Sequence, residues 1–280
     1  MNPARRSFFK GMGQVGLTAT AALLFGDAPI LNAQSTGSNQ DSANEILTAA
    51  LIAEDLATVF YYQGLTTNAV IQDPSLAGPG GSATSGTGNV PNVTYLRAAM
   101  AQEIQHATLL RAVGNISTGP TNDPYTTFYF PASTFQNLTN FIATLEELEN
   151  AFIGAYLNAV REFASLSSRS AVRNVPPGQF GASAYSSAQL SYYSQVAAAI
   201  MGVECEHRVL GTVITNTSQP NDRYYEQTAD LNAVYHGSRS AVAALTPFLT
   251  PTTGPGFSLL TALGAATTIG VSSKGNPPAV

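Results

Sequence analysis

The sequence predicts an all-α fold, a four-helix bundle, and two observations carry this prediction. Apolar residues recur at spacings of three and four along four long segments, which is the period of a helix with one buried face. These segments cover about residues 42–63, 94–113, 133–166 and 187–215. Polar stretches marked by Gly and Pro separate them at residues 66–93, 115–132 and 167–185, and no strand-like alternation is sustained.

The ends of the first two segments carry residues that start and stop helices. Ser42 is a good N-cap for the first segment, and Gly64 is predicted to stop it. The second segment begins at Thr94, behind Pro91, and Gly114 follows its last predicted residue. Loops as long as these connections are uncommon in compact domains, so each is expected to be functional, a decoration or a long crossover.

The first 33 residues have the features of an export signal that is removed from the mature protein. Arg5 and Arg6 lie in a basic segment, a mildly apolar segment follows at residues 11–26, and Ala33 precedes the predicted cleavage site. The arginine pair followed by Ser-Phe-Phe-Lys predicts a twin-arginine-type signal, with an ordinary secretory signal as the alternative. We therefore expect export to the periplasm or the extracellular space by the bacterial twin-arginine route.

The mature chain is predicted to hold one bundle and a tail. We assign residues 1–33 to the signal peptide, 34–250 to the bundle and 251–280 to the C-terminal tail. One or two short helices are expected within residues 222–249, and another within an otherwise extended tail. The apolar stretch 257–271 is broken by Gly and Thr and is too short to span a bilayer, so we expect a packed segment and no stable membrane insertion after signal removal.

Composition excludes several classes of function. Charged residues make up 10% of the chain, against roughly 25% in an average soluble domain, and this neutral polar character is typical of exported proteins. The net charge of −5 provides no basic surface, so nucleic acid is not an expected partner. Cys205 is the single cysteine, which excludes an intrachain disulfide and a Cys-rich metal site.

Each predicted helix places a glutamate in the middle of its apolar face. These residues are Glu54, Glu103, Glu149 and Glu204. An unpaired carboxylate in such a position would be costly, so the four side chains are expected to share a partner. In the third segment, Glu146 lies one turn earlier near the same face and remains an alternative to Glu149.

Two of the three histidines follow a glutamate by three residues, as His106 follows Glu103 and His207 follows Glu204. This spacing puts both side chains on neighbouring ridges of one helix face, where both can reach the same ion. The pattern also repeats along the chain, because each Glu-x-x-His helix is preceded by a helix with Glu and Tyr seven residues apart. Those pairs are Glu54 with Tyr61 and Glu149 with Tyr156. The repeat predicts a site with pseudo-twofold symmetry.

The segments 54–61, 102–106, 149–156 and 204–207 resemble the exported ferritin-like domain family that includes desiccation-related proteins. The resemblance covers about residues 42–250. Proteins of the ferritin-like class use Glu from two helices and Glu-x-x-His from two others to hold a pair of metal ions, and they have a crossover between the second and third helices. The metal ligands that the resemblance implies are Glu54, Glu103, His106, Glu149, Glu204 and His207.

The resemblance also assigns roles within this set. Glu103 and Glu204 would bridge the two ions, and one histidine would bind each ion. Tyr61 and Tyr156 would hydrogen-bond to the ligands and are the residues expected to assist any catalysis. Related sites often have Asp just before the Glu of Glu-x-x-His, to orient a histidine, whereas this chain has Gln102 and Val203 there.

The oxygen- and nitrogen-rich ligand set favours iron, then manganese, with zinc as a further occupant. A di-metal centre of this type predicts an oxidase, ferroxidase or peroxide-removing activity, with dioxygen or peroxide as the small-molecule oxidant. The alternatives are a structural or stress-protective protein, or an assembly component, without turnover; a homo-oligomer is compatible with each. His236 is expected to be a surface or structural histidine, Cys205 a packed residue, and Glu206 solvated.

Overall fold

The protein was analysed as a computed structural model that describes residues 41–114, 117–173, 185–216, 225–226, 231–251 and 254–272. The predicted signal peptide, residues 1–33, lies outside the described residues, as do the last eight residues of the predicted tail, 273–280. The boundaries assigned to the signal, bundle and tail stay predictions.

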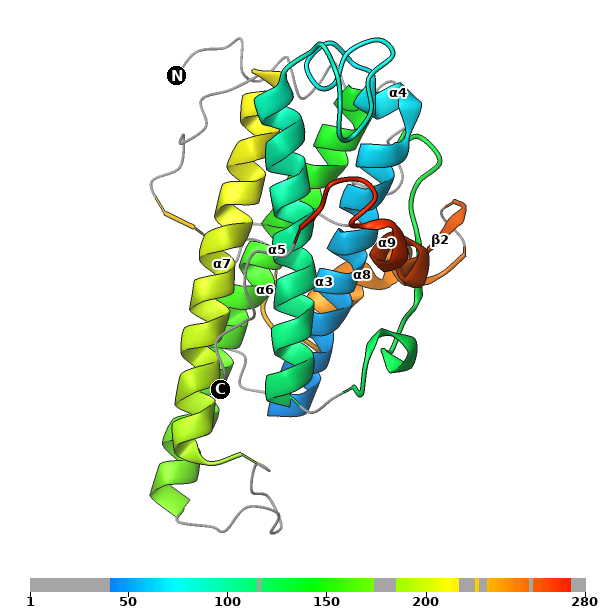
Figure 1. Cartoon of the computed structure of the whole chain (residues 1–280). Helices are drawn as coiled ribbons and strands as arrows, with labels where there is room; N and C mark the ends of the chain where they lie inside the picture. Colours follow the sequence, from blue (N-terminus) through cyan, green and yellow to red (C-terminus); the bar gives the residue numbers. More distant parts are fainter. Residues whose placement is uncertain are drawn as a thin grey trace. The chain divides into compact units, whose positions relative to one another are not determined.

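Four long helices lie side by side and confirm the predicted all-α bundle (Figure 1). They are α3 (Ala43–Thr66), α5 (Val90–Gly114), α6 (Leu138–Arg173) and α7 (Ser187–Thr215). Helix α3 packs chiefly along α5, and α6 packs chiefly along α7. The segment between α5 and α6 runs back along the bundle, so these two helices point in the same direction (Figure 1). It is the predicted crossover.

Shorter elements decorate the bundle. They are α4 (Asn68–Ile71), the 3-10 helix η1 (Pro120–Asn122), α8 (Ala241–Leu249) and α9 (Leu259–Ala265). Strand β1 (Thr127–Tyr129) in the crossover pairs antiparallel with β2 (Gly256–Ser258), although no strand was expected from the sequence. Strands of three residues are too short to produce a recognisable alternation. The pairing ties residues 256–258 to the crossover, and α9 packs against α3.

The apolar C-terminal stretch is packed, as predicted. Leu259 and Ala262 are fully buried, and Val271 is nearly so. None of the helices in the described part of the chain combines the length and apolar character needed to cross a lipid bilayer.

Helix ends follow local sequence signals, with one instructive exception. Ser42 caps α3 in a capping box with Glu45, and Ser186 caps α7 in the same way. The predicted stop at Gly64 is wrong, because α3 continues to Thr66. Gly64 is instead a packing residue, since a Cβ there would lie 2.3 Å from Cε2 of Phe141.

We expect the Gly64→Ala substitution to lower the free energy of unfolding by about 1–3 kcal/mol, the usual cost of overpacking a core. Phe141 has little freedom to move, because its buried ring stacks on Phe60 with centroids 4.6 Å apart. Gly202→Ala is the matched control: no heavy atom lies within 4 Å of its added Cβ. Removing a mid-helix glycine should stabilise the control by about 0.5–1 kcal/mol. Equal denaturant midpoints for both variants would contradict this explanation.

Candidate metal centre

The four predicted glutamates lie in the centre of the bundle, one on each long helix. Glu54 comes from α3, Glu103 from α5, Glu149 from α6 and Glu204 from α7. Each side chain is at most 2% exposed, so four carboxylates share a volume from which water is excluded. Apolar residues of the same helices surround them, which is why helical periodicity pointed to these faces, although it left Glu146 as an alternative to Glu149.

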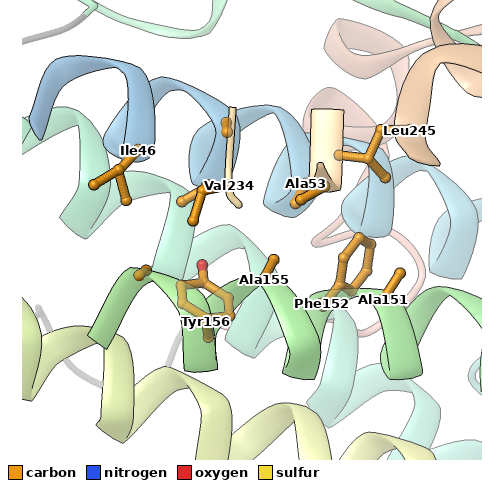
Figure 2. Close-up of a pocket in the computed structure, with 12 residues that line it drawn as sticks. Ile46, Ala53, Ala151, Phe152, Ala155, Tyr156, Val234 and Leu245 are labelled. Atoms are coloured by element: carbon orange, nitrogen blue, oxygen red, sulfur yellow. The ribbon is translucent and has the colours of Figure 1, made fainter. Parts of the chain in front are cut away.

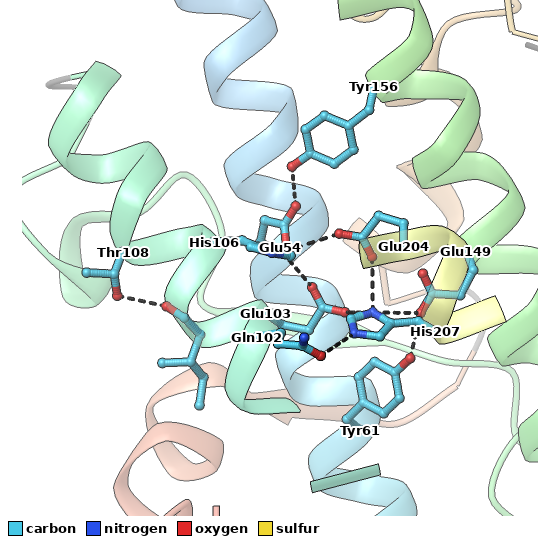
Figure 3. Close-up of polar contacts among 11 residues, drawn as sticks. Glu54, Tyr61, Gln102, Glu103, His106, Thr108, Glu149, Tyr156, Glu204 and His207 are labelled. Atoms are coloured by element: carbon cyan, nitrogen blue, oxygen red, sulfur yellow. Dashed lines mark hydrogen bonds and ion pairs between the residues drawn. The ribbon is translucent and has the colours of Figure 1, made fainter. Parts of the chain in front are cut away.

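The carboxylates and two histidines form two overlapping groups of potential ligands (Figure 3). One group contains Glu54, Glu103, His106 and Glu204, and the other contains Glu103, Glu149, Glu204 and His207. Within each group the ligand atoms lie within 4.8 Å of one another. Glu103 and Glu204 belong to both groups, which is the arrangement that two bridging carboxylates require.

Each histidine directs its Nδ1 atom at the carboxylates. The Nδ1 of His106 lies 3.1 Å from Oε2 of Glu54 and 3.3 Å from Oε1 of Glu204. The Nδ1 of His207 lies 2.9 Å from Oε1 of Glu103 and 3.2 Å from Oε2 of Glu204. The structure therefore gives each group one imidazole nitrogen, on opposite sides of the shared carboxylates.

The two predicted tyrosines hydrogen-bond to two of the glutamates (Figure 3). Tyr61 on α3 donates a hydrogen bond of 2.6 Å to Oε1 of Glu149 on α6. Tyr156 on α6 donates to Oε1 of Glu54 on α3. Each phenol thus holds the glutamate of the other half of the repeat.

Glu54 and Glu149 each belong to only one ligand group and are called the outer glutamates here. Burial and repulsion by the neighbouring carboxylates oppose their ionisation. Burial, followed by the charge of Glu204, raises the pKa of Glu54 and of Glu149 well above the ordinary value. Burial and the neighbouring carboxylates also raise the pKa values of Tyr61 and Tyr156, which keeps both phenols protonated as donors.

The basic partners respond in the opposite sense. Burial alone would lower the pKa of His106 and of His207, but Glu54 and Glu103 respectively are the main carboxylates that raise it well above the ordinary value. Burial would likewise raise the pKa of Glu103, yet the attraction of His207 and hydrogen bonds from both histidines hold it well below its usual range. Without a metal, the cluster therefore balances its charge with protons on the histidines and outer glutamates.

The donor set could hold metal ions. Within the described residues, Oε2 of Glu149 has no hydrogen-bond partner, and the oxygens of Glu103 and Oε1 of Glu204 are reached only by the Nδ1 atoms of the two histidines. Buried polar atoms without partners are rare, and a bound ion is one of the few physical reasons for them. Four carboxylates carry four negative charges when ionised, and two divalent ions would neutralise them.

The alternatives left open by the sequence lie elsewhere. Glu146 is half-buried and lies against Gly211 of α7, outside both ligand groups. Glu206 is exposed. Cys205 is also outside the ligand groups, and burial raises the pKa of its thiol to about 11.

His236 has a structural role on the outside of the bundle. Its Nδ1 lies 2.8 Å from Oδ1 of Asp41, and Asp41 also accepts the backbone N–H groups of Val234, Tyr235 and His236. The buried Asp41 carboxylate thereby fixes the segment that leads into α8 against the start of α3. These contacts explain the grouping of Asp41, Glu45 and His236 without an ion.

A small apolar cavity adjoins the centre (Figure 2). It measures about 20 Å³ and lies between α3, α6 and the segment that precedes and includes α8. Ala53, Phe152, Ala155 and Leu245 are among its walls, together with the ring of Tyr156. The phenol that holds Glu54 is therefore enclosed by apolar side chains, which strengthens its hydrogen bond by excluding water.

Fold and site together define an all-α bundle protein with a buried carboxylate–histidine cluster that could hold metal. Residues 42–176 match the family model of the ferritin-like domain, and this match supports the predicted relation to the ferritin-like superfamily. No match was found among curated proteins or among solved structures. The matched span contains Glu54, Glu103, His106 and Glu149. Glu204 and His207 lie beyond it, on α7, and the structure brings them into the same cluster.

Proposed function

We propose that this chain is an exported ferritin-like protein that binds a carboxylate-bridged pair of metal ions, iron or manganese, for redox chemistry. The observation that supports it best is the pair of ligand groups that share Glu103 and Glu204. A bound pair of redox-active ions would supply two electrons, one per ion, to dioxygen or peroxide, or would be oxidised as substrate in a ferroxidase reaction. Zinc would fit the donor set but could not carry out these steps.

The protein's own residues would hold the ligands and exclude water. Tyr61 and Tyr156 orient the two outer glutamates through hydrogen bonds, and burial removes the cluster from solvent. The protons that Glu54, Glu149 and the histidines keep in the absence of metal would leave when ions bind, because metal ligands must be deprotonated. Occupancy is therefore expected to rise with pH.

Export through the twin-arginine route is part of the proposal and rests on Arg5, Arg6 and the apolar segment behind them. That route carries folded proteins, and a buried centre is best loaded before export. The deciding measurement is metal analysis of protein purified after export with its own signal. About two iron or manganese ions per chain would support the proposal, and the absence of stoichiometric metal would overturn it.

A second candidate is a structural or stress-protective protein of the desiccation-related type, in which the bundle persists without turnover. The crossed Tyr–Glu hydrogen bonds and the histidine–carboxylate ion pairs favour it, because they hold the cluster together without metal. A strain carrying both Glu103→Ala and His207→Ala discriminates the two functions. An unchanged tolerance of desiccation or oxidants would favour the structural role, provided that the variant accumulates to the normal level.

A further inference from the structure

The two halves of the cluster differ in what holds their histidine. The Nε2 of His207 lies 2.9 Å from Oε1 of Gln102, on the side of the imidazole opposite the carboxylates (Figure 3). His106 also directs Nδ1 at the carboxylates, but no hydrogen bond to its Nε2 is found within the described residues. His106 is the more exposed of the two, with 12% of its side chain accessible against 4% for His207.

The contact with Gln102 has a definite chemical consequence. When Nδ1 of a neutral imidazole binds an ion, the hydrogen is on Nε2, and an amide oxygen can accept it. Such a partner fixes the tautomer and the orientation of the ring, and makes the other nitrogen a better ligand. Gln102 therefore fixes the His207 ring in the orientation that places Nδ1 toward an ion. The His106 ring has no such contact, so it loses orientational entropy when it binds an ion.

The difference originates at one position of the internal repeat. Gln102 directly precedes Glu103, and Val203 directly precedes Glu204. The amide oxygen of Gln102 accepts a hydrogen bond from His207 on α7. Val203 has no polar side-chain atom that could accept one from His106 on α5. One substitution between the halves thus breaks the pseudo-twofold symmetry of the centre.

We propose that Gln102 is a positioning residue that makes the two metal positions unequal. The position formed with Glu149 and His207 binds its ion first and more tightly, and the position formed with Glu54 and His106 binds the second, more labile ion. This inference rests on the proposed di-metal function. Changes in the partners of metal ligands typically alter affinity by 10- to 100-fold, so the two dissociation constants should differ by about that factor.

The test is a titration of the metal-free protein with Co²⁺ alone. Calorimetry and the visible absorbance of the bound ion monitor the binding. We expect two phases in the natural sequence. His207→Ala should remove the tighter phase, and His106→Ala the weaker one. Gln102→Leu should weaken the tighter phase by about 10- to 100-fold, so that the two phases merge. Gln102→Glu, which keeps an acceptor, should preserve the separation. Gln195→Leu, the same change at an exposed position of α7, is the matched control.

Val203→Gln approaches the question from the other half. An acceptor at this position should strengthen the weaker binding phase and bring the two dissociation constants closer together. This variant is the deciding test if circular dichroism shows that Gln102→Leu does not fold. Two ions bound with equal affinity, or a gap that neither variant changes, would overturn the role of Gln102 and leave the di-metal function standing. A protein that binds no Co²⁺ would overturn the di-metal function itself.

Discussion

Replacing both Glu103 and Glu204 with Gln is expected to abolish the binding of both metal ions while the helical bundle stays folded. The two carboxylates belong to both ligand groups, so their loss removes two ligands from each ion. Glutamine has nearly the same volume, so packing is kept. In the metal-free state the variant should be less stable than the natural protein, because the two carboxylates pair with the buried histidines and their loss leaves those histidines with fewer acceptors.

Metal content after equilibrium dialysis and the denaturant midpoint of the metal-free protein measure these effects. Glu206→Gln, an exposed change on the same helix as Glu204, serves as the control and should retain both ions. Glu54→Gln should retain the ion held with His207 and lose the other. Retention of two ions by the double variant would show that neither carboxylate bridges them.

Removing the metal is expected to lower the melting temperature strongly, and more so at higher pH. At a free ion concentration 1,000 times the dissociation constant, binding adds about 4 kcal/mol per site. For a chain of this size that corresponds to a difference of about 8–16 °C for one site.

The pH dependence follows from the signs of the pKa shifts. Glu54, Glu149, His106 and His207 have raised pKa values in the folded, metal-free protein. A group of this kind stabilises the fold below its unfolded pKa and loses that contribution as the pH rises through the folded pKa. Glu103, whose pKa is lowered, loses its contribution only in acid, below its ordinary value of 4.5.

Metal-free protein should therefore become less stable between about pH 5.5 and pH 8, whereas ion binding becomes stronger over the same range because it displaces protons. Scanning calorimetry at about pH 5.5 and at about pH 8 measures the gap in melting temperature between the metal-loaded and the metal-free protein. A gap that shrinks with rising pH would contradict the assignment of these side chains as ligands.

Helical periodicity predicted the four long helices and the glutamate that each contributes, because burying a carboxylate on an apolar face is tolerated only with a partner. It could not choose between Glu146 and Glu149, which lie one turn apart on the same helix. The structure places Glu149 in the cluster, and Glu146 lies where Gly211 of α7 leaves room. Which of the two glutamates enters the cluster depends on how α6 packs against α7, and this packing cannot be read from the local sequence.

Other features depended on contacts distant in sequence. The pairing of β1 with β2 joins segments more than 100 residues apart, and three-residue strands carry no pattern of their own. The sequence predicts a helix stop at Gly64 because nothing in it identifies Phe141 as the packing partner of this glycine. In the sequence alone, Gln102 is only a departure from the family pattern. Its contact with His207 depends on how α5 packs beside α7.

The crossed hydrogen bonds of Tyr61 and Tyr156 have a consequence for assembly of the molecule. Each ligand group draws on α7 and on α5, and each outer glutamate is held by a tyrosine of the other hairpin. Neither hairpin can offer a complete site before it docks on the other. Capture of the ions would therefore report that the two hairpins have docked and that the bundle is complete.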